Sequence, residues 1–305
     1  MVFRIMKKSC VFIGFGKQAQ EYANVFQKLN IKISSIFVQN KKKYYDLQKK
    51  YLIDRIDTDL ISCLTESNYD FVVVMLPWNE IEKSLPKVIK VSKKNFIFVE
   101  KPVALSIESL TKLTKLSFKY KKKVYVLYNR RFYNVFKIVK KFLKKNKLQS
   151  FRMEISEKEK EIINKKSRKI IGNIKYHITS HWIDLVMWLF NIKYLRVKSQ
   201  NESYNLIPKK NYLIDLNYEG NKPIAINFNF INFSLKIQSL EKLYLIKDNK
   251  KKLIINERKT SIFKPGILNI VKTMMLLVQS KKITTKIPLI GELKNLYIVL
   301  AKIKK

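Results

Sequence analysis

A glycine turn between a strand and a helix constrains the fold of this chain more than any other feature. The apolar run at 11–13 is followed by Gly14-Phe15-Gly16-Lys17-Gln18-Ala19 and then by an amphipathic stretch. Gly14 permits a tight turn, Gly16 lets the backbone approach a ligand, and Ala19 is small enough for close helix packing. The chain has only six glycines. The pattern predicts a pyrophosphate site at a helix N-terminus, with a plain strand-to-helix turn as the alternative.

The order of apolar runs indicates two kinds of sheet. Short β-rich runs alternate with amphipathic stretches from residue 9 to about 128, which is typical of a parallel sheet with crossover helices. Later runs follow one another across turns such as Glu219-Gly220-Asn221 and Asp248-Asn249, which indicates a largely antiparallel sheet. We predict an α/β fold: a doubly wound parallel sheet in a dinucleotide-binding domain over 1–128, then an α+β domain over 129–305. This second domain would have a largely antiparallel, open-faced sheet; the family resemblance given below implies substrate binding and oligomerisation for it.

The periodicity of the apolar residues predicts the individual elements. The expected strands lie near 9–13, 31–38, 71–76, 96–100, 123–128, 148–156, 194–199, 212–219, 223–232, 241–246 and 251–256. The expected helices lie near 17–29, 41–51, 58–66, 79–93, 106–119, 133–145, 176–190, 266–280 and 289–303.

Composition excludes several classes of protein. The 305 residues are 47% hydrophobic and 12% aromatic, which favours a globular protein with a large core over a disordered one. The longest apolar runs have the length of strands, so neither an export signal nor a membrane span is expected. Cys10 and Cys63 stand in no CxxC pair, which argues against a disulfide framework and a zinc site. We expect a cytoplasmic protein with two reduced thiols.

The net charge of +40 does not predict a specific nucleic-acid site. Only eight of the 63 basic residues are arginines, and the lysines are spread along the whole chain. Groove-reading proteins favour arginine for its bidentate geometry. The chain is also rich in Asn, Ile and Tyr, which share A/T-rich codons with Lys, so nucleotide bias accounts for the lysines. Contact with a polyanion, or attraction of anionic substrates by the field of the protein, remains the alternative.

The end of the second predicted strand bears on the choice of cofactor. NAD-selective sites place Asp or Glu there to bind the ribose, whereas this chain has Gln39 and Asn40 followed by Lys41-Lys42-Lys43. Amides and lysines would tolerate or attract a 2′-phosphate. The cofactor is therefore NAD or NADP, with NADP favoured; the alternative is that the amides bind the ribose hydroxyls and the lysines are solvated.

Two further segments reach the carboxyl edge of the predicted sheet, where ligands of open α/β sheets bind. Pro77-Trp78-Asn79 follows the apolar run that ends at Leu76, and Glu100-Lys101-Pro102 follows the apolar run at 96–99. A lysine at a buried strand end is desolvated, which lowers its pKa and lets it bind a hydroxyl or relay its proton; a surface charge is the alternative. The predicted cofactor-binding residues are Gly14, Phe15, Gly16, Lys17, Gln18, Gln39, Asn40, Leu76, Pro77, Trp78, Glu100 and Lys101.

The only two histidines, His177 and His181, are four residues apart, which places them on one face of a helix. A metal site would need a third ligand, and a zincin would need a glutamate at the position of Ile178. No metal site is therefore predicted. Asn129 and Arg131 follow the last strand of the first domain. Their polar side chains could contact a ligand, although packing explains them equally well.

Taken in order, the glycine turn, Glu100-Lys101-Pro102 and the histidine helix at 176–190 resemble the Gfo/Idh/MocA family of NAD(P)-dependent sugar oxidoreductases. The resemblance implies a Rossmann domain, a cis Lys101-Pro102 bond, and hydride transfer between a nicotinamide and a hydroxyl or keto carbon of a sugar or nucleotide sugar. By analogy we expect a role in surface-polysaccharide biosynthesis and a homodimer or homotetramer.

The resemblance also implies roles for individual residues. In the family pattern Asp-x-x-x-His-x-x-Asp, His181 and Asp184 match the last two positions, while His177 replaces the first acid. The implied catalytic residues are Lys101, His181 and His177, and the implied substrate-binding residues are Lys101, Asn129, Arg131, His177, His181 and Asp184. Because His177 replaces an acid, a non-catalytic nucleotide- or sugar-binding regulator or scaffold is the alternative function.

Overall fold

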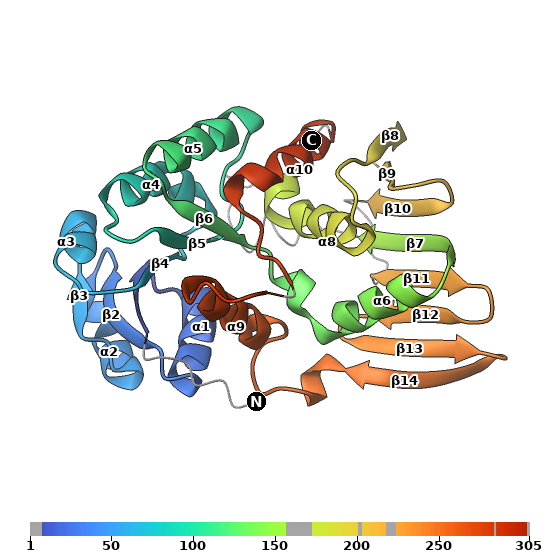
Figure 1. Cartoon of the computed structure of the whole chain (residues 1–305), viewed down its shortest axis with the longest axis horizontal. Coiled ribbons are helices and arrows are strands. Elements are labelled where there is room, and N and C mark those ends of the chain that lie inside the picture. The colour runs from blue at the N-terminus through green and yellow to red at the C-terminus, as the bar shows by residue number, and fades with distance from the viewer. Residues whose placement is uncertain (1–7, 157–172, 201–202, 218–223, 284, 304–305) are drawn as a thin grey trace. The chain divides into compact units, whose positions relative to one another are not determined.

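The computed structural model describes residues 8–156, 173–200, 203–217, 224–283 and 285–303. The chain forms two compact units (Figure 1). The first contains the residues up to Asn129 together with Ile267–Lys294, and the second contains Arg130–Gly266 and the residues from Asn295 on. The predicted turn at 219–221 lies outside the described residues. None of the helices in the described ranges has the length and hydropathy needed to cross a bilayer.

The first unit contains the predicted parallel sheet, with six strands where the sequence predicted five. Its strands are β1 (Ser9–Ile13), β2 (Lys32–Phe37), β3 (Arg55–Asp57), β4 (Phe71–Val74), β5 (Phe96–Glu100) and β6 (Lys123–Leu127). Its crossover helices are α1 (Lys17–Lys28), α2 (Tyr45–Tyr51), α3 (Leu60–Thr65), α4 (Trp78–Val91) and α5 (Ile107–Lys119). The strand order β3-β2-β1-β4-β5-β6 reverses between β1 and β4, and this switch point is where open α/β sheets bind ligands.

Strand β3 was not predicted because its charged residues hide it from a hydrophobic pattern. Arg55 Nε donates to Asp57 Oδ1 at 2.7 Å, and the buried Ser35 Oγ donates to Asp57 Oδ2 at 2.5 Å. These bonds satisfy the carboxylate inside the unit, where an unpaired charge would be costly. One of these two partners, Ser35, lies on β2 and is distant in sequence from β3.

The segment Ile267–Lys294 packs with the first unit, whereas the sequence assigned it to the second domain. Helix α9 (Ile267–Val278) contacts α1, and its buried face includes Ile270 and Met274. Further on, Val126 N of β6 donates to Pro288 O at 2.9 Å. Apolar periodicity predicts such a helix but does not say which core covers its apolar face.

The second unit contains an eight-stranded sheet of order β14-β13-β12-β11-β7-β10-β9-β8, and only β7 and β10 pair in parallel. Its strands are β7 (Leu148–Ser156), β8 (Arg196–Gln200), β9 (Ser203–Ile207), β10 (Tyr212–Asn217), β11 (Ala225–Phe230), β12 (Ser234–Gln238), β13 (Lys242–Lys247) and β14 (Lys250–Asn256). The described ranges further contain η1 (Lys41–Tyr44), η2 (Asn129–Phe132), α6 (Asn134–Lys145), the π-helical turn η4 (Lys175–Thr179), α8 (Ser180–Phe190), η5 (Glu257–Lys259), η6 (Ile290–Leu293) and α10 (Lys294–Ala301).

One face of this sheet is apolar and packs against helices. In β11 the buried Ile226 and Phe228 flank Asn227, which faces the other side. Phe151 of β7 contacts Phe190 of α8 with ring centroids 4.9 Å apart, so α8 covers the apolar face. The predicted open-faced, largely antiparallel sheet is confirmed. Strands β9 and β12 were missed, because each is only five residues long and has no apolar run longer than two residues.

Candidate functional site

The glycine turn after β1 has the geometry that its sequence predicts. Gly14 has φ +88°, and a Cβ there would lie 2.8 Å from Met75 O, so only glycine fits. Its N–H donates to Phe37 O at 2.9 Å, which ties the ends of β1 and β2 together. Gly16 is the N-cap of α1, no side chain caps this helix, and a Cβ at Gly16 would have no atom within 4 Å. The N-terminus of α1 is therefore open to an anion.

These two glycines are expected to respond differently to substitution. Gly14→Ala should lower the free energy of unfolding by about 2 kcal/mol or more, because it adds backbone strain to a steric overlap. Gly16→Ala should leave folding intact but weaken nucleotide binding, because its methyl group would occupy the open space at the helix end. Chemical denaturation and nucleotide titration measure the two effects. Equal stability of both variants would contradict this account of the turn.

A cavity of about 610 Å³ opens at this turn, within the usual range for small-molecule sites. It lies at the switch point, because its walls come from the ends of β1, β2 and β4 and from the start of α4. Its lining residues are Gly14, Phe15, Gly16, Lys17, Gln18, Phe37, Val38, Gln39, Asn40, Lys43, Tyr44, Met75, Leu76, Pro77, Glu80 and Ser84. Of the predicted cofactor residues, Trp78, Glu100 and Lys101 do not line this cavity.

The loop after β2 brings a lysine to the cavity. Gln39 and Asn40 are exposed, and Asn40 Oδ1 accepts a hydrogen bond from Lys42 N at 3.1 Å. Asn40 therefore caps the 3-10 turn η1, which carries Lys43 and Tyr44 into the lining. The sequence alone did not show which of the three consecutive lysines would reach the cofactor site. Once Asn40 caps η1, Lys43 is the lysine of the three that lines the cavity.

Glu80 is a second cavity residue that the sequence did not predict. It lies in the first turn of α4 and lines the cavity, with a side chain 35% exposed. Asn79 Nδ2 donates to Glu80 Oε1 at 3.1 Å, and Lys83 Nζ lies 3.5 Å from the same oxygen. The usual position for an acid that recognises the ribose is the end of β2. This acid instead follows β4, so a search of the second strand could not find it.

Lys101 lies directly after β5 and is only 8% exposed. Its bond to Pro102 is cis, as the resemblance implied. Because β4 and β5 pair through Val74 and Val99, Leu76 and Lys101 leave the sheet at the same carboxyl edge. Glu100 precedes Lys101 and is half-buried.

In the second unit, the two histidines flank a junction between two kinds of helix. The N–H of Ser180 bonds to Lys175 O, an i→i−5 spacing, so residues 175–179 form a π-helical turn and α8 begins at Ser180. His177 lies in the π turn and His181 in the first turn of α8, and both are half-buried. The sequence predicted one regular helix from 176 to 190. Single π turns in helices occur frequently at functional sites.

Arg131 and Asp184 bind each other. Arg131 Nε donates to Asp184 Oδ2 at 2.7 Å, and Nη2 donates to Oδ1. Asp184 is 2% exposed; burial raises the pKa of its carboxyl, and the charge of Arg131 acts in the opposite direction. The resemblance implied that Arg131 and Asp184 bind substrate. In the structure the two side chains instead bind each other in a buried, bidentate ion pair. Asn129 begins η2 and is half-buried.

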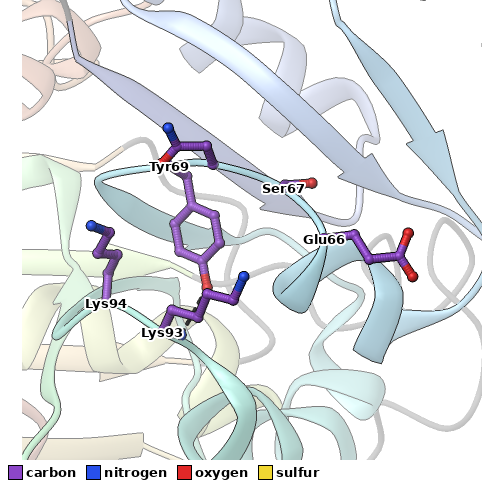
Figure 2. Close-up of a pocket in the computed structure, with 6 residues that line it drawn as sticks. Glu66, Ser67, Tyr69, Lys93 and Lys94 are labelled. Carbon is purple, nitrogen blue, oxygen red and sulfur yellow. Dashed lines mark hydrogen bonds between the residues drawn. The ribbon is translucent and has the colours of Figure 1, made fainter.

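The thiols and a second cavity offer no comparable chemistry. Burial raises the pKa of Cys63 to about 12, which leaves it inert as a nucleophile. A cavity of about 290 Å³ lies beside Tyr69 (Figure 2). Tyr69 OH donates to Leu64 O at 3.1 Å and accepts from Lys93 N at 3.0 Å. The Tyr69 hydroxyl beside this cavity therefore already has hydrogen-bond partners within the protein. Across the described ranges, no three His, Cys, Asp or Glu side chains gather as metal ligands.

Residues 8–128 match the Gfo/Idh/MocA model, described as an oxidoreductase family with an NAD-binding Rossmann fold. The nucleotide-binding domain belongs to the Gfo/Idh/MocA oxidoreductases. The match covers the strands and turns that form the 610 Å³ cavity as far as Ser84. The observed geometry fits the dinucleotide of a Gfo/Idh/MocA domain, because Gly16 leaves open space at an uncapped helix N-terminus.

Solved structures extend the Gfo/Idh/MocA likeness to the fold of the whole chain. A dehydrogenase (MviM) from Clostridium difficile is 18% identical, with a TM-score of 0.77 and coverage of 98% of this chain and 99% of that one. An oxidoreductase from Agrobacterium radiobacter, in complex with NAD+, L-tartaric acid and magnesium, is 14% identical with a TM-score of 0.74, covering 97% and 95%. The super-repressor mutant of Gal80p from Saccharomyces cerevisiae is 12% identical with a TM-score of 0.78, covering 98% and 95%. No curated protein matches the sequence.

Proposed function

We propose that this chain is an NAD(P)-dependent oxidoreductase that acts on the hydroxyl or keto carbon of a sugar or nucleotide sugar. The observation that carries the proposal is the glycine turn, which opens an uncapped helix N-terminus onto a cavity of about 610 Å³ at the switch point of the sheet. Bound there, a nicotinamide cofactor would accept or donate the hydride. The helix dipole and backbone N–H groups of α1 would hold its pyrophosphate.

Lys101 and His181 are proposed to handle the oxygen and its proton. Lys101 is buried at the carboxyl edge of the sheet, where an ammonium group can hold the oxygen of the reacting carbon. During oxidation His181 would take the hydroxyl proton as the carbonyl forms, and during reduction it would return that proton. His177 would modulate this transfer from the π-helical turn that directly precedes α8.

The direct test is cofactor reduction or oxidation, followed by absorbance, with a panel of nucleotide sugars and polyols. Turnover that depends on Gly16 would support the proposal, and cofactor binding without turnover on any member of the panel would contradict it. Surface-polysaccharide synthesis, a cytoplasmic location and a homodimeric or homotetrameric state remain predictions.

A matched pair of lysine variants tests cofactor choice. The protein should bind NADPH at least as well as NADH, because Lys43 lines the cavity and a hydrogen bond to a charged group stabilises by about 1.5–3 kcal/mol. Lys43→Gln should therefore weaken NADPH roughly tenfold or more with little effect on NADH. Lys41→Gln is the control, because Lys41 is exposed and does not line the cavity. Fluorescence titration measures all six affinities, those of the wild type and of each variant for NADH and for NADPH. Tenfold tighter NADH binding to the wild type would point to Glu80 as the group that recognises the ribose.

A non-catalytic regulator or scaffold is the second candidate. One observation favours it: the super-repressor mutant of Gal80p shares the fold with a TM-score of 0.78. The presence of His177 where the family pattern has an acid is consistent with lost catalysis. Nucleotide binding that alters assembly or partner binding, without hydride transfer, would support this candidate.

A further inference from the structure

A π turn interrupts the helix that carries the two histidines. The N–H of His177 donates to Asn173 O at 3.2 Å, which is the i→i−4 spacing of an α-helix. The N–H of Ser180, by contrast, donates to Lys175 O, five residues back. The chain therefore accommodates one extra residue between these two bonds. Such turns are rare, so specific contacts are needed to favour one over a continuous α-helix.

The first contact comes from the side chain of Ser180. In a continuous α-helix the N–H of Ser180 would donate to Tyr176 O, four residues back. Here that N–H goes to Lys175 O, and the Ser180 hydroxyl donates to Tyr176 O instead, at 2.6 Å. Ser180 is 1% exposed, and a bond made away from water is costly to lose. The hydroxyl thus takes the place that the π spacing denies to the backbone N–H.

The second contact comes from the segment that follows α10. Lys175 Nζ donates to Ile303 O at 2.6 Å, and partial burial of the ammonium group lowers the pKa of Lys175. A hydrogen bond from a charged donor is among the stronger ones. Beside it, the rings of Tyr176 and Tyr297 lie with centroids 5.5 Å apart. The residue whose carbonyl accepts the π bond is therefore anchored through its own side chain as well.

The π turn affects how the two histidines are placed relative to each other. Each residue of an α-helix rotates the chain by about 100°, so side chains four residues apart share one face. A turn with one extra residue breaks this row between His177, within the π turn, and His181, in the first turn of α8. Both side chains are half-buried, so close packing limits the rotamers that could compensate for a different backbone path.

We propose that Ser180 and Lys175 are positioning residues, which hold the π turn and thereby set the placement of His177 relative to His181. Loss of either contact favours the continuous α-helix and rotates one histidine relative to the other. That this placement serves proton transfer rests on the proposed function. A misplacement of about 1 Å at a reacting group can cost about 10²-fold in rate.

NMR of the full-length protein with isotope-labelled histidine tests the placement without turnover. The chain has only two histidines, so the ring signals are assigned with His177→Asn and His181→Asn. Ser180→Ala should shift the ring signals, and Ser180→Thr, which keeps the hydroxyl, should leave them near their wild-type positions. Ser117→Ala is the matched control, because Ser117 is 4% exposed and its hydroxyl donates to Thr114 O at 2.7 Å in the regular helix α5. It should leave the ring signals unchanged.

Lysine variants test the second contact in the same way. Lys175→Met should shift the ring signals, and Lys175→Arg, which keeps a charged donor, should retain more of the wild-type pattern. Lys122→Met is the control, because Lys122 Nζ donates to Ser92 O at 2.5 Å in the first unit. With an accepted substrate, Ser180→Ala and Lys175→Met should each lower kcat about tenfold or more. Cofactor affinity should change little, since the 610 Å³ cavity contains neither residue.

Two results would overturn the inference: unchanged ring signals in folded Ser180→Ala and Lys175→Met, or equal shifts in the Ser117→Ala and Lys122→Met controls. Thermal melting shows which variants fold; if Ser180→Ala does not, Lys175→Met decides. Shifted ring signals in a protein that turns over no substrate would support the positioning role and contradict the proposed function. Wild-type turnover with unchanged ring signals in both variants would do the reverse.

Discussion

Lys101→Met is expected to lower kcat by about 10²–10⁴, the contribution typical of a positioned group in proton transfer. The side chain is 8% exposed at the end of β5, so methionine fills its volume without the ammonium group. Lys101 does not line the 610 Å³ cavity, so cofactor affinity should change little. Lys90→Met, at an exposed position of α4, is the matched control and should retain wild-type kcat.

The same experiment separates one catalytic unit from two independent groups. His181→Asn alone should cost a similar factor, and the double variant should lose little more, because groups acting on one proton are not additive. His177→Asp, which restores the acid of the family pattern, should keep or raise kcat. Wild-type turnover by both single variants would remove Lys101 and His181 from the mechanism and favour the regulator.

Asp184→Asn is expected to lower the free energy of unfolding of the second unit by about 3–5 kcal/mol. Removing one partner of a buried pair leaves the other charge uncompensated, and this accounts for the size of the effect. Arg131→Met should destabilise to a similar degree for the same reason. The double variant Arg131→Met/Asp184→Leu should recover most of the loss, because neither charge remains buried.

An exposed pair in the same unit provides the control for this prediction. Arg152 Nη2 lies 3.2 Å from Asp215 Oδ2, with side chains 58% and 31% exposed, and Asp215→Asn should cost less than about 1 kcal/mol. Urea denaturation followed by the fluorescence of Trp182 and Trp188, both in this unit, measures all four variants. Equal denaturation midpoints for Asp184→Asn and Asp215→Asn would show that the buried pair contributes no more than a surface one.

The sequence by itself determined the local features. Gly14 and Gly16 predicted the turn, because a positive φ and an open backbone approach depend on the residue at the position itself. The alternation of strand and helix runs predicted the parallel sheet, and consecutive strand runs predicted the antiparallel one, because connection length limits how neighbouring strands pair. These signals lie within a few residues of one another, so one chain without relatives is enough to recognise them.

The tertiary structure decided which distant residues meet. Arg131 and Asp184 are 53 residues apart, and nothing local distinguishes an arginine that binds substrate from one that neutralises a buried carboxylate. Lys43 of η1 and Glu80 of α4 line the same cavity. Ile267–Lys294 packs with the first unit across more than a hundred intervening residues. Such pairings are set by the packing of whole elements and by the cost of burying an unpaired charge, and neither quantity is defined until the chain has folded.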